Sequence, residues 1–353
     1  MVTLYIGSTS GYSGKSLITM GMGLKLKDDS YRVGYIKPMG RLPVKSKDGI
    51  VDSDAEFMKK VLDLKEPAKV ICPVVLTFEF YRDALHEKIE DMEEKVIGAY
   101  NTIKDGKDIV LVGGAGGLYE GYSMKISGLH LIKKLDAKVI IVDRYTDEVC
   151  IDCLLAAKES IGKRLAGVIL NKVPMSSLQY VRDEIALFLK KRDIEVFGVI
   201  PQDKLLNSIT VQQLSDVLNG KVVTGEEYME EFVENFSIGA MDVDSALRYF
   251  RRIPNKAVIT GGHRADIQLA ALETSTRCLI LTGDMLPNDV IIGKAQTAKV
   301  PIISVRDDTF TTVEKIEGIL GKIRIREERK VTRAREILLA SVDFQGLYRK
   351  IGL

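Results

Sequence analysis

The sequence has no tryptophan, only three histidines and only four cysteines among its 353 residues. So few cysteines in a chain of this size do not provide the disulfide framework that holds small secreted domains together. No apolar run approaches the length that spans a bilayer, and a strand-like run follows Met1 with no signal peptide before it. We therefore expect a cytoplasmic protein that has no membrane partner.

The chain also has little net charge, since 51 Lys and Arg residues oppose 49 Asp and Glu residues. A balance of +2 gives no general affinity for polyanions, so we expect no nucleic acid as a partner. Apolar residues make up 46%, which is ordinary for a globular protein. The length is sufficient for two domains, each with its own core.

Strand-like runs alternate with helical patterns from end to end, which predicts an α/β fold with mainly parallel strands. We expect a first domain over residues 1–205, a smaller α/β domain over 206–321 and a basic C-terminal helix over 322–353. In the first domain, helical patterns cover residues 17–26, 54–64 and 82–101. The strand-like runs there are residues 2–6, 32–36, 108–112, 138–143, 166–171 and 196–201.

The most informative motif is GSTSGYSGKS at residues 7–16, between the first strand-like run and the first helical pattern. This context predicts a phosphate-binding loop, in which backbone N–H groups and the helix N-terminus favour an anion. Lys15 adds charge for the β- and γ-phosphates, and the Ser16 hydroxyl is suited to Mg²⁺. Thr9 stands where the usual pattern has glycine, and an ordinary turn with a surface lysine is the alternative. The expected phosphate ligands are Thr9, Ser10, Gly11, Tyr12, Ser13, Gly14, Lys15 and Ser16.

The first half resembles dethiobiotin synthetase, a P-loop enzyme that transfers phosphate to a carbamate. The resemblance spans about residues 1–205 and implies a P-loop NTPase-type sheet that binds ATP and Mg²⁺. It is carried by an ordered series of short segments, at residues 7–16, 34–38, 52–55, 114–117, 166–171 and 198–201.

The resemblance also implies roles for residues at the strand tips. Lys37 matches a second catalytic lysine that complements Lys15, and Asp54 matches an aspartate that holds Mg²⁺ together with Ser16. A surface lysine after a strand is the alternative for Lys37. Capping of the following helix by Ser53 or Asp52 is the alternative near Asp54, and both readings can hold together.

Two further matches concern the base, and one position departs from the family. Asn171 matches the residue that reads the adenine edge, and Pro201 matches a loop that encloses the base. The family has a metal-binding glutamate where this chain has Gly113. Glu120 or Asp143 could replace it in space. The missing carboxylate favours nucleotide binding over fast phosphoryl transfer.

Strand-like runs of the second half lead into VITGGHRAD at residues 258–266 and LTGD at residues 281–284. In these segments the second half resembles the DRTGG domain. Its two glycine-containing turns follow strand-like runs and predict an anion pocket, with ordinary strand-to-helix turns as the alternative. The two resemblances in this order match the N-terminal regulatory region of long phosphate acetyltransferases. Because the acetyltransferase catalytic domain is absent from these residues, we expect no phosphate acetyltransferase activity from the chain itself. The expected ligand residues of the second domain are Gly261, Gly262, His263, Arg264, Thr282 and Asp284.

The sequence therefore favours an ATP- and Mg²⁺-binding regulatory protein, with a second domain that senses a small-molecule effector or mediates assembly. By analogy with related acetyltransferases, we expect a homo-oligomer. One alternative is an ATP-dependent ligase or kinase that activates a carboxylate or carbamate. Another is a structural oligomerisation module with a vestigial nucleotide site.

Overall fold

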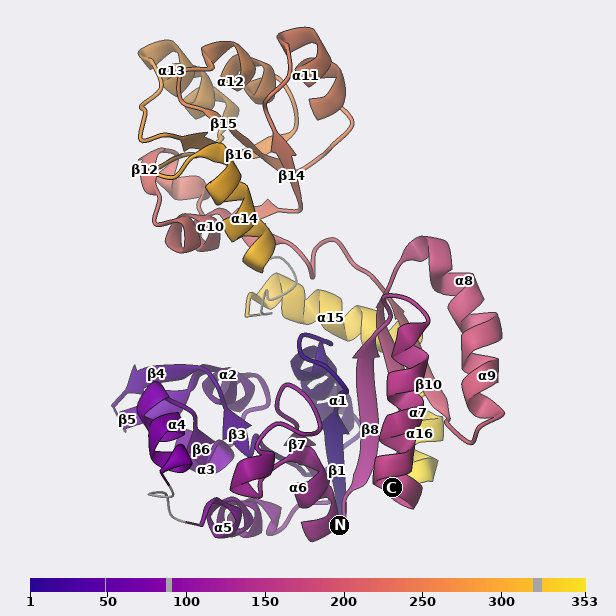
Figure 1. The fold of residues 1–353 in the computed structure, drawn as a ribbon. Coiled ribbons are helices and arrows are strands. Elements are labelled where there is room, and N and C mark those ends of the chain that lie inside the picture. The colour runs from indigo at the N-terminus through magenta and orange to yellow at the C-terminus, as the bar shows by residue number, and fades with distance from the viewer. Residues whose placement is uncertain (48, 87–90, 320–325) are drawn as a thin grey trace. The chain divides into compact units, whose positions relative to one another are not determined.

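The structure is a computed structural model that describes residues 1–47, 49–86, 91–319 and 326–353. The chain divides into two compact units, of which the first joins residues 1–202 to 326–353 and the second comprises 203–325. The second unit is therefore an insertion in the chain of the first (Figure 1). Among the described residues, no helix combines the length and the hydropathy needed to cross a bilayer.

The first unit is built on a six-stranded sheet whose strands run parallel in the order β10-β9-β8-β1-β7-β2. Its strands are nearly continuous Val, Ile and Leu runs, as expected where both faces are covered by helices. The predicted parallel α/β sheet is confirmed. The strands are β1 (Val2–Gly7), β2 (Val33–Ile36), β7 (Ile109–Gly113), β8 (Lys138–Arg144), β9 (Leu165–Val173) and β10 (Val196–Pro201).

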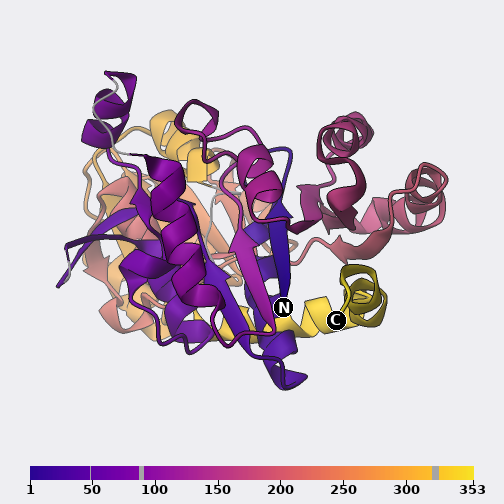
Figure 2. The same cartoon turned by 90° about the horizontal axis from the view of Figure 1, so that it is seen from below.

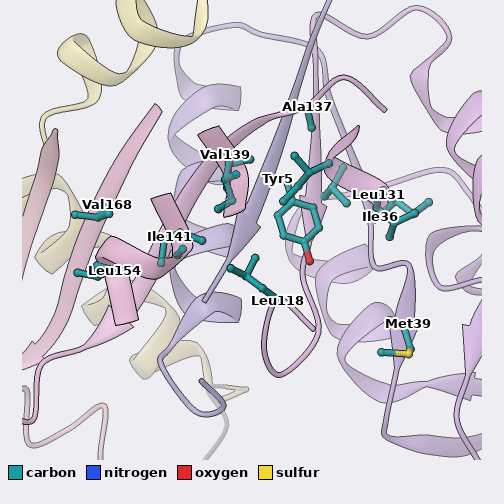
Figure 3. Packing of buried hydrophobic residues seen from close by; sticks show 14 of the residues in the cluster. Tyr5, Ile36, Met39, Leu118, Leu131, Ala137, Val139, Ile141, Leu154 and Val168 are labelled. Atoms are coloured by element: carbon teal, nitrogen blue, oxygen red, sulfur yellow. The ribbon is translucent and has the colours of Figure 1, made fainter. Parts of the chain in front are cut away.

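One face of this sheet carries an extensive hydrophobic core. Tyr5 of β1 lies in that core beside Leu118 and Leu131 (Figure 3). The helices that pack here are α5 (Met92–Lys104), α6 (Gly128–Lys134), α7 (Val149–Ile161) and a helical run made of α8 (Leu178–Tyr180), a π-helical turn (Val181–Ile185) and α9 (Ala186–Lys190).

The other face carries α1 (Lys15–Asp28) and α2 (Ser53–Val61), with the C-terminal helices α15 and α16 (Figure 2). A β-carbon at Gly23 of α1 would lie 2.8 Å from Leu62 and 3.5 Å from Leu111, so α1 packs tightly there. The smaller elements are β3 (Met39–Gly40) paired with β6 (Val74–Val75), the hairpin of β4 (Pro43–Ser46) and β5 (Gly49–Asp52), α3 (Ala68–Ile71) and α4 (Phe78–Leu85).

The helix expected over residues 82–101 is wrong as a single element, because α4 ends at Leu85 and α5 begins at Met92. Asp91 starts the second helix: its carboxylate accepts hydrogen bonds from the backbone N–H groups of Glu93 and Glu94. Residues 87–90 lie outside the described residues.

The second unit contains a five-stranded mixed sheet in the order β12-β17-β16-β15-β14. Strands β14 to β17 are parallel, and β12 is an antiparallel edge strand. This confirms the predicted smaller α/β domain. Its strands are β12 (Lys221–Thr224), β14 (Asn235–Ile238), β15 (Lys256–Gly261), β16 (Thr276–Thr282) and β17 (Ile302–Val305), with a short pair of β11 (Ile209–Thr210) and β13 (Phe232–Val233). Its helices are α10 (Val211–Leu218), α11 (Val243–Phe250), α12 (Ala265–Leu272), α13 (Asp289–Ala298) and α14 (Thr309–Ile319).

The C-terminal segment forms two helices, α15 (Glu328–Ser341) and α16 (Phe344–Ile351), where the sequence predicts one. The break lies at Val342, which bridges Gly198 on the edge strand β10, and at Asp343, whose N–H donates to the Phe197 carbonyl at 2.7 Å. The segment packs on the first unit, since a β-carbon at Gly21 would lie 2.0 Å from Leu338. Residues 322–325 of the expected helix lie outside the described residues.

Candidate functional site

The glycine-rich loop connects β1, which ends at Gly7, to α1, which begins at Lys15. Gly14 has a φ of 92°, in the left-handed region that favours glycine. A β-carbon at Gly14 would also lie 2.1 Å from the Asn171 side chain. Position 14 therefore requires glycine for both its backbone conformation and its packing.

Lys15 is folded back on the loop. Its Nζ donates to the Ser8 hydroxyl at 2.6 Å and to the Gly116 carbonyl at 2.9 Å. Burial lowers the pKa of Lys15 to about 8, despite the opposing effect of the negative charges of Asp143 and Glu120. The positive charge of Lys37 lowers it further, so the two lysines lie within electrostatic reach of each other. Phosphate oxygens would be stronger acceptors for this ammonium group than its two neutral partners.

Thr9 is anchored by Asp143 at the carboxyl end of β8. The backbone N–H of Thr9 donates to Asp143 Oδ1 at 3.0 Å, and its hydroxyl donates to Oδ2 at 2.6 Å. Burial raises the pKa of Asp143, and the two hydrogen bonds from Thr9 oppose that effect without cancelling it. The departure from glycine at position 9 thus has a structural reason, because the threonine side chain ties the loop to a neighbouring strand.

Asn171, in β9, anchors the loop from the next strand along. Its Nδ2 donates to the Ser13 carbonyl at 2.8 Å, and the side chain is buried. The role of Asn171 toward adenine stays a prediction, as does that of Pro201, the last residue of β10.

The buried Ser13 hydroxyl has no hydrogen-bond partner in the described part of the chain. A buried unpaired hydroxyl is costly, and a bound ligand or water would satisfy it.

Lys37 lies between two carboxylates. Its Nζ donates to Asp52 Oδ1 at 2.8 Å and to Asp54 Oδ2 at 2.9 Å. Burial lowers the pKa of Lys37, but the charges and hydrogen bonds of Asp54 and Asp52 outweigh burial, and the net shift is upward. Asp52 also caps α2 by accepting from the backbone N–H groups of Asp54 and Ala55 at 3.1 Å each. Capping and ion pairing thus coexist at this position.

Position 113, at the carboxyl end of β7, is covered by an aromatic ring. A β-carbon there would lie 2.9 Å from the Tyr35 hydroxyl oxygen and 3.1 Å from its Cε2. Of the two carboxylates that could replace the missing glutamate, Asp143 is bound to Thr9. Glu120 accepts from the Gly116 N–H and pairs with Arg41 at 2.5 Å.

Arg326, from the C-terminal segment, contacts the residues that begin α2, next to Lys37. Its Nη2 donates to the Ser53 hydroxyl at 2.7 Å and lies 3.9 Å from Asp54 Oδ1. Ser53 and Asp54 are the first two residues of α2. The chain therefore returns from the second unit to the first at a residue that contacts the Lys37–Asp54 pair.

The groups present fit a nucleoside triphosphate with Mg²⁺. The loop offers a buried lysine and the N-terminus of a 14-residue helix. Ser16, exposed on the first turn of that helix, and Asp54 are the oxygen donors for a hard cation. The orphaned Ser13 hydroxyl supports a bound group at this loop. A bound Mg²⁺ would neutralise phosphate charge there.

In the second unit, the two predicted turns meet at the carboxyl ends of β15 and β16, where the Gly262 N–H donates to the Thr282 carbonyl at 3.2 Å. The Arg264 guanidinium is already paired with Asp266 through two hydrogen bonds of 2.9 Å. The His263 ring folds over Gly261, whose β-carbon would lie 2.7 Å from it. Asp284 has a φ of 56°, and its N–H donates to the Val305 carbonyl at 2.9 Å.

Four groups at the nucleotide loop and its surroundings were not among the sequence-predicted ligands: Ser8, the Gly116 carbonyl, Tyr35 and Arg326. Gly116 lies in a segment that the sequence singles out, but a carbonyl contact has no sequence signature. Tyr35 stands two residues before Lys37 in a strand that ends at the site, which is the one signal that could have drawn attention to it. Arg326 is distant in sequence from every motif.

Comparison with known proteins places the chain in two domain families. The model of the AAA domain (AAA_26) matches residues 2–210, and that of the DRTGG domain matches residues 213–319. The phosphate acetyltransferase of Pseudomonas aeruginosa is 24% identical over 379 residues, covering 100% of this chain and 52% of that protein. The chain thus spans about half the length of the phosphate acetyltransferases it matches.

Two further relatives each match one part of the chain. The ATP-dependent dethiobiotin synthetase of Clostridium perfringens is 24% identical over 225 residues, covering 62% of this chain and 98% of that enzyme. A crystal structure of the CBS and DRTGG domains of the Clostridium perfringens pyrophosphatase, with its activator diadenosine tetraphosphate, is 18% identical. It covers 44% of this chain and 73% of that one, with a TM-score of 0.29.

The glycine-rich loop after β1, the parallel sheet and the matched residues agree with one another, and the dethiobiotin synthetase-like and DRTGG resemblances are confirmed. The chain belongs to the AAA domain family with a dethiobiotin synthetase-like P-loop domain, followed by a DRTGG domain, and is homologous over its whole length to the N-terminal half of phosphate acetyltransferases.

Proposed function

We propose that the first unit binds ATP with Mg²⁺ and that this binding regulates the protein rather than driving rapid turnover. The observation that carries the proposal is the buried Lys15, held against the loop by Ser8 and the Gly116 carbonyl. A surface lysine on an ordinary turn would be solvated. Here a cation is kept largely out of water, and none of the described residues gives it a carboxylate at hydrogen-bond distance, which favours an anionic ligand.

The anchoring of the loop supports the same conclusion. Asp143 and Asn171, from adjacent strands, hold Thr9 and Ser13 through contacts within the protein. A loop fixed in this way loses little conformational entropy when a phosphate binds. Family membership supports nucleotide as the ligand, because the dethiobiotin synthetases that match residues of this domain are ATP-dependent.

The residues around the expected Mg²⁺ position favour nucleotide binding over phosphoryl transfer. No carboxylate extends from Gly113, and the charge of Lys37 is opposed by Asp52 and Asp54. Phosphoryl transfer needs positive charge and metal ligands directed at the transferring group. Arg326 also contacts Ser53, so ligand binding near Asp54 would affect the segment that leads back to the second unit.

For the second unit we propose a small-molecule effector at the turn formed by Gly261 and Gly262. Gln268 is fully buried and its Nε2 donates to both glycine carbonyls, at 3.2 and 3.0 Å. Its Oε1 has no partner among the described residues. Since Arg264 is neutralised by Asp266, we expect this effector to be recognised by hydrogen bonds more than by charge.

The test is isothermal titration of the wild type and of Lys15→Ala with ATP, with and without Mg²⁺, followed by phosphate release from the same samples. Lys138→Ala is the matched control, since Lys138 is exposed at the opposite end of β8. We expect ATP binding to be lost only in Lys15→Ala, with little phosphate released. An absence of binding by the wild type would refute the proposal.

Rapid phosphate release would instead favour an ATP-dependent ligase or kinase. The observation that favours this second function is the electrostatic proximity of Lys15 and Lys37, two cations that could share a transferring phosphoryl group. In that case, addition of small carboxylates or amines with CO₂ should raise the rate of release, and Lys37→Ala should abolish the increase.

A further inference from the structure

Tyr35 has no role in the site as described so far, although it reaches the carboxyl end of the sheet. It lies on the edge strand β2, and its side chain is only 5% exposed. The hydroxyl end of its ring covers Gly113, whose β-carbon would be 2.9 Å from the hydroxyl oxygen. Gly113 is followed at once by the segment whose Gly116 carbonyl holds Lys15.

The Tyr35 hydroxyl has no hydrogen-bond partner among the residues that the structure describes. The hydroxyl oxygen is also not completely buried. In this it differs from the four completely buried side-chain atoms of the described residues that lack a partner, which are Ser13 Oγ, Arg164 Nε, Ser237 Oγ and Gln268 Oε1. Burial raises the pKa of Tyr35 well above its usual value, and the nearby charges of Asp54 and Asp52 raise it further. The phenol is therefore a neutral donor that faces the acidic side of the site.

We propose that Tyr35 is a specificity-determining residue of the nucleotide site, whose hydroxyl donates a hydrogen bond to an oxygen of the bound triphosphate at the end of β7. This inference rests on the proposed nucleotide binding. A carboxylate extending from position 113 would need a cation between itself and a phosphate. A phenol in the same space needs none, because it binds the anion directly.

The placement has a second consequence for the choice of ligand. Among the described carboxylates near Ser16 and Lys37, Asp52 is fully buried, and Asp143 and Glu120 are bound to Thr9 and Gly116. Asp54 remains, and it already pairs with Lys37. The site therefore contributes little negative charge toward a cation. ATP should bind with a modest dependence on Mg²⁺, and the terminal phosphate should account for a large part of the affinity.

The experiment compares ATP and ADP titrations of the wild type, Tyr35→Phe and Tyr100→Phe, each with and without Mg²⁺. Tyr100 is the matched control, because its hydroxyl forms a hydrogen bond with Thr3 at 2.6 Å within the core that α5, α6 and α7 cover. We expect Tyr35→Phe to lower the affinity for ATP about tenfold and to leave that for ADP nearly unchanged, as for one lost hydrogen bond to a charged group. Tyr100→Phe should change neither affinity.

Thermal unfolding of the three proteins separates ligand recognition from folding, since a merely structural tyrosine would lower the melting temperature without changing the ratio of ATP to ADP affinity. An unchanged ratio in Tyr35→Phe would overturn this inference and leave nucleotide binding intact. A wild type that binds neither nucleotide would overturn the proposed function, and this inference with it.

Discussion

A buried lysine is the residue that most clearly separates this loop from an ordinary turn. Lys15 makes two hydrogen bonds to neutral oxygens, and desolvation makes its charged form less stable than it is in water. A phosphate group would reverse that effect by placing negative charge beside the ammonium. Binding of nucleotide should therefore be linked to protonation of this side chain.

Nucleotide affinity should consequently depend on pH. The pKa of Lys15 is lowered to about 8 in the folded protein, so the side chain is charged below that pH and loses its charge above it. We expect ATP affinity to be constant up to about pH 7.5 and to fall by up to tenfold per unit above about pH 8. Calorimetry at pH 8 in buffers of different ionisation enthalpy should show proton uptake on binding. An affinity that rises with pH would contradict this prediction.

Tyr35 and Gly113 should be coupled in stability. Gly113→Ala places a β-carbon about 3 Å from the Tyr35 ring, and we expect it to lower the free energy of unfolding by about 1–3 kcal/mol. In a Tyr35→Ala background the same change should cost much less, because the ring is gone. Chemical denaturation of the four proteins of the cycle measures the coupling. Additive effects would show that the ring does not limit position 113.

At the scale of elements, the loop is positioned by the carboxyl ends of two strands that follow it far along the chain. Asp143 of β8 holds Thr9, and Asn171 of β9 holds Ser13. Parallel strands bring their carboxyl ends to one edge of the sheet, so side chains from these two strands meet at the loop between β1 and α1. The loop is thereby held ready for a ligand by its neighbours as well as by its own glycines.

Loss of the Asp143 anchor should weaken nucleotide binding. We expect Asp143→Ala to lower ATP affinity about tenfold, because the backbone and hydroxyl of Thr9 lose their acceptor and the loop becomes less ordered. Asp136→Ala is the control, since that carboxylate is exposed and pairs with Arg164 at 3.0 Å, away from the loop. Thr9→Val should reproduce part of the loss, and the double variant should lose little more than Asp143→Ala. Independent effects of the two changes would argue against the anchor.

At the scale of the whole molecule, the second unit is an insertion whose two connections to the first have different surroundings. One follows Pro201 at the carboxyl end of β10, and the other precedes Arg326, which contacts Ser53 and lies near Asp54. The first connection therefore leaves from the same edge of the sheet as the nucleotide loop. The second returns at a residue that contacts the start of α2, beside Asp54. This topology provides a covalent route by which ligand binding in one unit can affect the other.

Removal of the Arg326 contact should uncouple the two units. We expect hydrogen exchange in residues 203–319 to change when ATP binds to the wild type, and this change to be reduced in Arg326→Ala while ATP affinity stays within about threefold. Arg335→Ala is the control, because Arg335 lies in the same segment and pairs with Asp28 away from the site. An undiminished exchange response in Arg326→Ala would exclude this residue as the link.

The sequence determined the class of fold and the position of the loop, because both depend on local pattern. Alternating apolar runs predicted the parallel sheet, and GSTSGYSGKS marked the turn between β1 and α1. The segments around Lys37, Gly116 and Asn171 were also found from the sequence, since each follows or forms part of a buried strand. Short motifs of this kind are visible because chain neighbours form them.

The tertiary structure decided what those residues contact. The single helix expected over 82–101 is divided by the Asp91 cap, and the C-terminal segment is broken where it bridges β10. Tyr35 over Gly113 and Arg326 at Ser53 join residues 78 and 273 positions apart. The reason is physical: a local pattern fixes which face of a strand or helix a side chain occupies, whereas the partner on that face depends on how the elements pack.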